Sequence, residues 1–249
     1  MTYKIAELSW TEYEKRLQKS PVLILPVGAT EQHGPHLPMN CDAIFAEAVA
    51  VGLAERIDGL VMPTLSYGYK SQPRSGGGQN FIGTTSLDAQ TLISMVRDIL
   101  RELARHGATK VLIVNAHVEN QWFITEGIDL ALRDIPLNSM QIRRCEYWDF
   151  TPQDTLDQVF DGPFPGVDLE HAALLETSMM LALHPEWVDL SLAPENILAE
   201  FPPYDVYPHT HDRVPPSGVL APTRGASSAK GHLLIRTTLD AMEAAFQNF

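Results

Sequence analysis

The chain has 249 residues, of which 45% are hydrophobic and 20% are charged, so it is neither disordered, collagen-like nor a coiled coil. Its 18 basic and 31 acidic residues give a formal net charge of −13, and no segment concentrates Lys and Arg. A field of that sign repels phosphate backbones and anionic lipid, which disfavours nucleic acid and membrane surfaces as partners.

The chain contains two cysteines, Cys41 and Cys145, far apart in the sequence. This usage excludes a disulfide scaffold and a zinc–thiolate cluster, and it favours a reducing compartment. Residues 1–7 lack the apolar core of a signal peptide, and the longest apolar runs have the length of strands. We therefore expect a soluble, cytoplasmic protein.

Short apolar runs alternate with longer segments of helical period along the chain. In chain order, we predict a strand at 21–27, a helix at 42–56, a strand at 59–63, a helix at 87–106, a strand at 110–115, a helix at 120–133, a strand at 139–145, and helices at 169–183 and 230–246. Trp10 and Trp122 are predicted to lie in the core. This alternation is typical of an α/β fold, a three-layer sandwich whose mostly parallel central sheet is flanked by helices. No composition shift marks a boundary, so we predict a single domain over 1–249.

Polar side chains that bind metals occur in pairs beyond two of the predicted strands. The pairs are Glu31 with His33 and His117 with Glu119. In extended chain, a spacing of two places both side chains of a pair on one side. Asp42 begins the helix that follows the first pair. Because ligands bind beyond the carboxyl ends of parallel strands, we expect these five side chains to meet there.

Two histidines and three carboxylates exceed what one catalytic zinc takes, which is about three protein ligands and a water. Five ligands suit two divalent ions about 3.5–4 Å apart, bridged by one carboxylate. Imidazole and carboxylate without thiolate favour zinc or manganese over copper or iron–sulfur clusters. The alternative interpretation is a set of scattered polar loop residues; the paired spacing favours the metal site.

A third segment runs from Asp168 through His171 to Glu176. With Asp168 as N-cap, His171 would lie in the first helical turn, where the helix dipole keeps the imidazole neutral and available as a base. The alternative is an ordinary capped helix with a surface histidine, and the spacing does not separate the two. Glu176 shares the site only if the helix begins near His171.

Weaker features complete the candidate site. Ser75 precedes three glycines that lack the Gly-Lys-Ser/Thr of a phosphate loop, so this segment is a turn or a close backbone approach to a ligand. Trp148 follows a predicted strand, where it forms either a pocket floor or part of the core. His36 is expected to support the metal ligands without binding an ion.

The sequence resembles the creatininase (creatinine amidohydrolase) family along nearly its whole length. The matching segments are 25–34 (LPVGATEQHG), 67–72 (YGYKSQ), 75–78 (SGGG), 83–88 (GTTSLD), 101–108 (RELARHGA), 126–133 (EGIDLALR), 147–150 (YWDF), 170–171 with 176–178 (EH and ETS), and 201–206 (FPPYDV). The resemblance implies two metal ions per subunit, a homo-oligomer that is a hexamer in this family, and a small cyclic amide as substrate. Glu31 and His117 would hold one ion, His33 and Glu119 the other, with Asp42 bridging.

Two positions depart from the pattern that this resemblance implies. Val118 stands where creatininase carries a tyrosine, and Val167 stands where it carries a tryptophan. Each change removes an aromatic contact worth about 0.5–1.5 kcal/mol. A bulkier or more aliphatic ring amide is therefore an expected substrate beside creatinine.

The resulting hypothesis is metal-dependent hydrolysis of a C–N amide bond in a cyclic amide, such as creatinine to creatine. Glu119 and His171 take the catalytic roles, His171 as proton shuttle to the leaving nitrogen. The substrate-binding set is Ser75, Val118, Trp148, Val167, Asp168 and His171, with His36 and Glu176 as supporting residues. Two alternatives stay open: a deformylase of the same fold acting on linear formamides, and a non-catalytic metal-containing binding protein.

Overall fold

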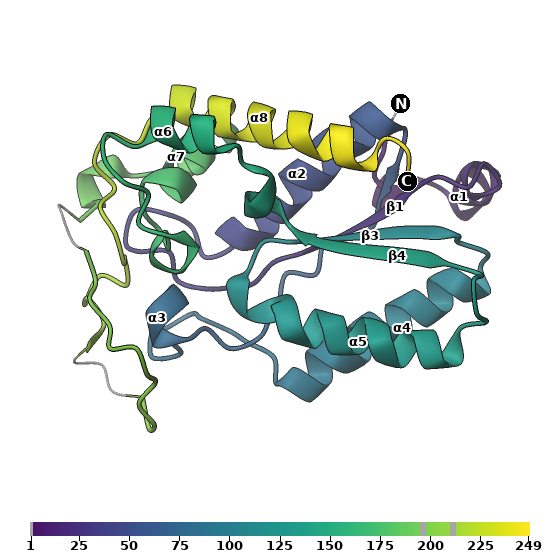
Figure 1. The fold of residues 1–249 in the computed structure, drawn as a ribbon, viewed down its shortest axis with the longest axis horizontal. Helices are drawn as coiled ribbons and strands as arrows, with labels where there is room; N and C mark the ends of the chain where they lie inside the picture. The colour runs from purple at the N-terminus through teal and green to yellow at the C-terminus, as the bar shows by residue number, and fades with distance from the viewer. Residues whose placement is uncertain (1, 195–197, 210–212) are drawn as a thin grey trace.

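The computed structural model describes residues 2–194, 198–209 and 213–249. A parallel sheet lies between two layers of helices (Figure 1). The strands are β1 (Leu23–Val27), β2 (Leu60–Val61), β3 (Lys110–Asn115) and β4 (Gln141–Glu146). The helices are α1 (Trp10–Leu17), α2 (Cys41–Ile57), α3 (Pro73–Gly76), α4 (Ala89–Arg105), α5 (Gln121–Asp134), α6 (Gln153–Val159), α7 (Leu174–Leu183) and α8 (Ser228–Phe246).

The four strands run in the order β2-β1-β3-β4, and all pairs are parallel. Residues of β1 and β3 are completely buried along almost their entire length, because helices cover both faces of the sheet. Val27 pairs with Asn115, so β1 and β3 end side by side. The loops that leave these two strands therefore start at one edge of the sheet.

The helical layer formed by α4 and α5 covers one face of the sheet (Figure 1). Helix α4 buries Leu92, Val96, Leu100 and Leu103, one face of the helix at a spacing of three and four residues. These side chains pack on Leu25 and its neighbours from the sheet and form an apolar cluster.

The opposite layer contains α2, α7 and α8 (Figure 1). Helices α7 and α8 approach so closely that a Cβ at Gly231 would lie 1.9 Å from the carbonyl oxygen of Ser178. Helix α2 buries one side along its length, from Cys41 to Ala54, and its first turn includes the buried Asp42. This layer therefore brings charged groups as well as apolar side chains against the sheet.

The predicted three-layer α/β fold is confirmed, and the strand over 110–115 has the predicted bounds. The prediction was wrong for the helix over 169–183: α7 begins at Leu174, and a separate 3₁₀ helix spans Val167–Leu169. Helices α1 and α6 were not predicted. Trp10 and Trp122 were predicted as core residues but are 75% and 70% exposed. No described helix is both long enough and apolar enough to cross a bilayer.

The remaining short helices among the described residues are 3₁₀ turns in the connections. They are Ile5–Glu7, Val118–Asn120, Tyr147–Phe150, Val167–Leu169, Pro185–Trp187 and Leu190–Leu192. The helix Val118–Asn120 lies just beyond the end of β3, and the helix Tyr147–Phe150 directly follows β4. These connections shape the polar edge of the sheet.

Candidate metal centre

The loop after β1 is held close to the start of α2. A Cβ at Gly28 would lie 2.4 Å from the backbone nitrogen of Ala43, so only glycine fits this contact. The backbone N–H of Glu31 donates to the carbonyl oxygen of Met39 at 2.8 Å and closes the loop. As a result, the carboxylate of Asp42 lies beside the side chains that follow β1.

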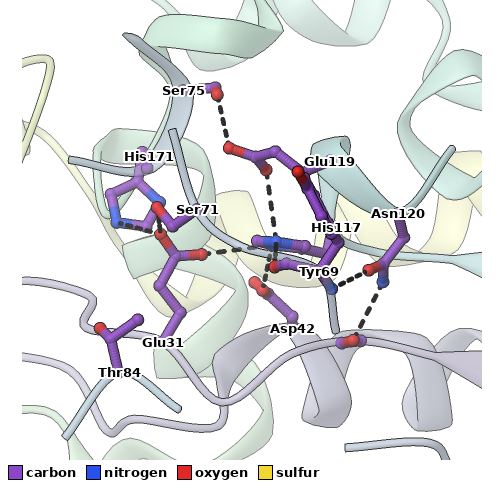
Figure 2. Close-up of polar contacts among 12 residues, drawn as sticks. Glu31, Asp42, Tyr69, Ser71, Ser75, Thr84, His117, Glu119, Asn120 and His171 are labelled. Atoms are coloured by element: carbon purple, nitrogen blue, oxygen red, sulfur yellow. Dashed lines mark hydrogen bonds and ion pairs between the residues drawn. The ribbon is translucent and has the colours of Figure 1, made fainter. Parts of the chain in front are cut away.

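Glu31, Asp42 and His117 form one buried group of ligand atoms (Figure 2). The Nδ1 atom of His117 lies 3.2 Å from Oε2 of Glu31 and 3.0 Å from Oδ2 of Asp42. The Nε2 atom of His117 lies 3.1 Å from the carbonyl oxygen of Tyr69. A carbonyl accepts only, so Nε2 carries the proton and the lone pair of Nδ1 faces the two carboxylates.

His33 is arranged in the same way on the other side of Asp42. Its Nδ1 donates to the carbonyl oxygen of Glu31 at 3.1 Å. Its Nε2 lone pair then faces Oδ1 of Asp42 at 3.0 Å and Oε2 of Glu176 at 3.7 Å. His33, His171 and Glu176 form a second group of convergent ligand atoms. Asp42 thus directs one carboxylate oxygen toward each group.

These residues fit two divalent cations. Nε2 of His33 and Oδ2 of Asp42 are buried and make no hydrogen bond within the part of the chain that the structure describes. A lone pair that faces a carboxylate is repelled unless a proton or a metal cation lies between them. Glu31, Asp42, Glu119 and Glu176 carry a charge of 4 × −1 = −4 when ionised, and two divalent ions supply 2 × +2 = +4. The donors are imidazole and carboxylate, which suits zinc and manganese.

The pKa values show how strongly the site attracts positive charge. Burial raises the pKa of Glu31 to about 7. Burial also opposes ionisation of Asp42, but the neighbouring His33 and His117 bring its pKa below the ordinary value. For His117, burial lowers the pKa, and the carboxylates led by Glu119 outweigh this effect, so its pKa is raised well above 6.5. A cation in this cluster therefore replaces protons.

Glu119 lies beside His117 (Figure 2). Its Oε2 is 3.3 Å from Nε2 of His117. Its Oε1 accepts hydrogen bonds of 2.7 Å from the hydroxyl of Ser75 and from the backbone N–H of Gln72. The expected pairing of His33 with Glu119 differs from this arrangement, in which Glu176 is the carboxylate next to His33.

His171 precedes α7 and is not in its first turn, so the expected effect of the helix dipole was wrong. Asp168 lies within the 3₁₀ helix, and the N-cap of α7 is Ala173. Ala172 has a φ of +55°, and its N–H donates to Oε2 of Glu176 at 2.5 Å. This bond holds the strained turn and brings both His171 and Glu176 to the site.

The imidazole of His171 is nevertheless neutral. Burial lowers its pKa well below 6.5, and the adjacent His33 adds to the effect. Its Nε2 lies 2.8 Å from the carbonyl oxygen and 2.9 Å from the side-chain amide nitrogen of Gln32. Because both amide hydrogens of Gln32 are donated to other carbonyl groups, Nε2 of His171 carries the proton and donates to the Gln32 carbonyl. Its Nδ1 makes no hydrogen bond to any residue that the structure describes. The lone pair of Nδ1 is free to take a proton.

Gln32 and Glu170 are among the site residues that the sequence analysis missed. The amide nitrogen of Gln32 donates to the carbonyl oxygens of Gly76 and Gly218 at 3.1 and 3.0 Å, and it ties three loops together. The buried carboxyl of Glu170 accepts from the backbone N–H of Leu175 at 3.1 Å and caps α7. A carboxyl residue just before a helix was a signal for Glu170; no local pattern marked Gln32.

Most of the ligand residues, Glu31, Asp42, His117 and Glu176 among them, line one cavity. Of the predicted substrate-binding residues, those at the cavity wall are Ser75, Val118, Trp148, Val167 and His171. Asp168 is exposed and lines a neighbouring groove. His36 is buried behind the site, where its Nε2 lies 2.9 Å from the hydroxyl of Thr177.

A family model described as creatininase, creatinine amidohydrolase, matches residues 6–246. The chain belongs to the creatininase family. The creatinine amidohydrolase of Pseudomonas putida is 47% identical over 248 residues, which cover 98% of this chain and 95% of the relative.

Solved creatininase structures share the fold throughout. The manganese form and a Glu-to-Gln variant of the Zn-Zn type each have a TM-score of 0.97 and 46% identity, covering 99% of this chain and 98% of theirs. The same variant complexed with creatine has a TM-score of 0.96 and 46% identity, covering 98% of this chain and 97% of its own. This chain therefore has both the creatininase fold and a cavity lined by metal-binding side chains.

Proposed function

We propose that this chain is a metal-dependent amidohydrolase that hydrolyses creatinine to creatine. The observation that carries the proposal is the carboxylate of Asp42, whose two oxygens face two buried imidazole lone pairs at the wall of one cavity. The relatives add support: one is a creatinine amidohydrolase, and one related structure contains creatine.

Glu31, Asp42 and His117 would hold one divalent ion, zinc or manganese, and His33, Asp42 and Glu176 the other. When bound, such ions lower the pKa of water and polarise a carbonyl group. This ligand set assigns to Glu176 the position beside His33 that the family resemblance implied for Glu119.

Glu119 would then act at the cavity wall, beside His117. Its carboxylate is held by two hydrogen bonds, from Ser75 and from the backbone of Gln72, so its orientation is fixed before substrate enters. An ionised carboxylate in this position accepts a proton from the attacking water.

His171 moves the second proton. Its Nε2–H is fixed on the carbonyl of Gln32, so Nδ1 is the atom that exchanges a proton at the cavity. The neutral imidazole takes the proton and delivers it to the ring nitrogen as the C–N bond breaks. Trp148, which packs edge-on against Tyr147, forms a rigid wall against a flat ring.

The test is a hydrolysis panel on the purified protein with creatinine, other cyclic amides and N-formyl compounds, before and after chelation. We expect turnover of creatinine that chelation abolishes and added zinc or manganese restores. Turnover of formamides alone would indicate a deformylase. Bound metal without turnover of any amide would indicate a non-catalytic binding protein.

The assembly and location are also proposed on family grounds. We expect a single domain that forms a homo-oligomer, a hexamer by resemblance, in the cytoplasm. Exposed apolar side chains such as Trp122, Leu137 and Ile82 support burial in an assembly, and two free cysteines support a reducing compartment. Light scattering coupled to size exclusion tests the hexamer.

A further inference from the structure

A second hollow adjoins the cavity at Val167. This groove is lined by Arg74 and by a stretch of the chain around the 3₁₀ helix Val167–Leu169. Val167 lines both the cavity and the groove. Ser75 lines the cavity while its neighbour Arg74 lines the groove, and α3 packs against the 3₁₀ helix. Two short side chains, Ser75 and Val167, therefore stand where the two hollows adjoin.

The groove offers space and an apolar surface. A Cβ at Gly166, at the start of the 3₁₀ helix, would meet no heavy atom within 4 Å. Pro165, Leu169, Ala199 and Phe201 contribute apolar side chains to the groove. Ala199 and Phe201 belong to a small apolar cluster that Leu169 joins, so this wall is a packed surface.

Arg74 supplies a cation to the same groove. Its Nη1 lies 3.7 Å from Oδ1 of Asp205, beyond hydrogen-bond distance, so the guanidinium retains donors for a ligand. The exposed carboxylate of Asp168 lies on the same groove and would repel an anion placed beside it. A carboxylate on a ligand is accordingly expected to bind at the Arg74 side.

We propose that the groove is a subsite for a substituent of the ring, and that the chain hydrolyses cyclic amides with an extended apolar chain ending in a carboxylate. This inference rests on the proposed function and deepens it. One water is consumed: a C–O bond forms at the carbonyl carbon, the ring C–N bond breaks, and the proton goes to the leaving nitrogen. The product is an open-chain carboxylate that keeps the substituent.

The experiment compares kcat/KM for creatinine and for two analogues whose ring nitrogen carries butyl or 4-carboxybutyl in place of methyl. We expect the carboxybutyl analogue to be hydrolysed at least as efficiently as creatinine, and the butyl analogue to follow within about tenfold. Loss of all three activities would overturn the proposed function. Turnover of creatinine alone would overturn the subsite only.

Two variants locate the subsite. Val167→Trp enlarges the side chain at the junction, so the ratio of carboxybutyl to creatinine kcat/KM falls by at least about tenfold. Arg74→Gln raises KM for the carboxybutyl analogue about tenfold without a matching change for the butyl analogue. Lys70→Gln is the matched control, because Lys70 is an equally exposed cation paired with Asp88.

The ratio is measured on protein that melts within a few degrees of wild type. If Val167→Trp does not fold, Arg74→Gln and the wild-type panel decide the question. An unchanged ratio in folded Val167→Trp, or equal effects of Arg74→Gln and Lys70→Gln on the carboxybutyl analogue, would overturn the assignment.

Discussion

The two helical layers of this protein cover the same sheet but bury different chemistry. The α4 and α5 layer buries apolar side chains against Leu23, Leu25 and their neighbours. The α2, α7 and α8 layer buries an apolar cluster too, and in addition it brings Asp42 and Glu176 to the edge of the sheet. The α4 and α5 layer therefore contributes to stability, whereas the α2, α7 and α8 layer contributes to stability and also positions ligands of the metal site.

This division predicts that changes in the two layers have separable effects. The largest effect is expected for Asp42→Asn, because this carboxylate faces both ligand groups. We expect kcat for creatinine to fall about a thousandfold, equal to about 4 kcal/mol, with loss of bound metal. Asp98→Asn, an exposed change on α4, is the control. Retention of a tenth of wild-type activity by Asp42→Asn would contradict the ligand set.

Leu100→Ala probes the apolar layer. Leu100 is fully buried on α4, so its truncation costs about 2–5 kcal/mol of unfolding free energy. Metal content and kcat should remain at wild-type values below the melting temperature. Glu126→Ala, at an exposed polar site on α5, should change stability by about 0.5 kcal/mol or less. A loss of metal in Leu100→Ala would show that the layers are not separable.

His36 contacts Thr177 of α7 and makes the stability of the α2, α7 and α8 layer depend on pH. Burial lowers its pKa from 6.5 to about 4. Between these values the unfolded chain binds a proton that the folded chain does not, so stability falls as pH drops from 6.5 to 4, by about 3 kcal/mol from this residue.

Urea unfolding of wild type and His36→Gln at pH 7, 5 and 4 measures this contribution. We expect the variant to lose less stability than wild type on acidification. His171, whose pKa is also lowered, is present in both proteins and cancels in the difference. Parallel pH curves would refute the role of His36.

The smallest effect is expected at the contact between α7 and α8. In Gly231→Ala the new Cβ meets the carbonyl oxygen of Ser178, so the helices must shift, at a cost of about 1–3 kcal/mol. Because Glu176 lies on α7, the affinity for the second ion should fall about tenfold. Ser228→Ala, an exposed change in the same helix, is the control. Unaltered metal affinity in Gly231→Ala would show that the packing of α7 against α8 does not affect the metal site.

The features that could be predicted from the sequence are those determined by the hydrophobic period and by the positions of the strand ends. The strand over 110–115 and the convergence of Glu31, Asp42 and His117 follow from a buried parallel sheet and its carboxyl edge. The site residues of α7 were less accessible to prediction. The positive φ of Ala172 depends on a hydrogen bond to Glu176, which no local pattern encodes.

The exposure of aromatic side chains was a second feature that could not be predicted from the sequence. An aromatic residue at a helix start, such as Trp10, fits equally well in a core or on a surface that another chain covers, and the sequence period does not separate the two. Likewise, the family resemblance implied Glu119 and His33 on one ion, whereas the side chain of Glu119 turns toward Ser75. Rotamers of loop residues are set by tertiary contacts.

The most direct test of the metal centre is a titration of metal-free protein with zinc or manganese while creatinine hydrolysis is followed. The account predicts no turnover without metal and a rise in activity that reaches its plateau at two equivalents per chain. Full turnover by the metal-free protein, or a plateau at one equivalent with no second ion bound, would contradict it.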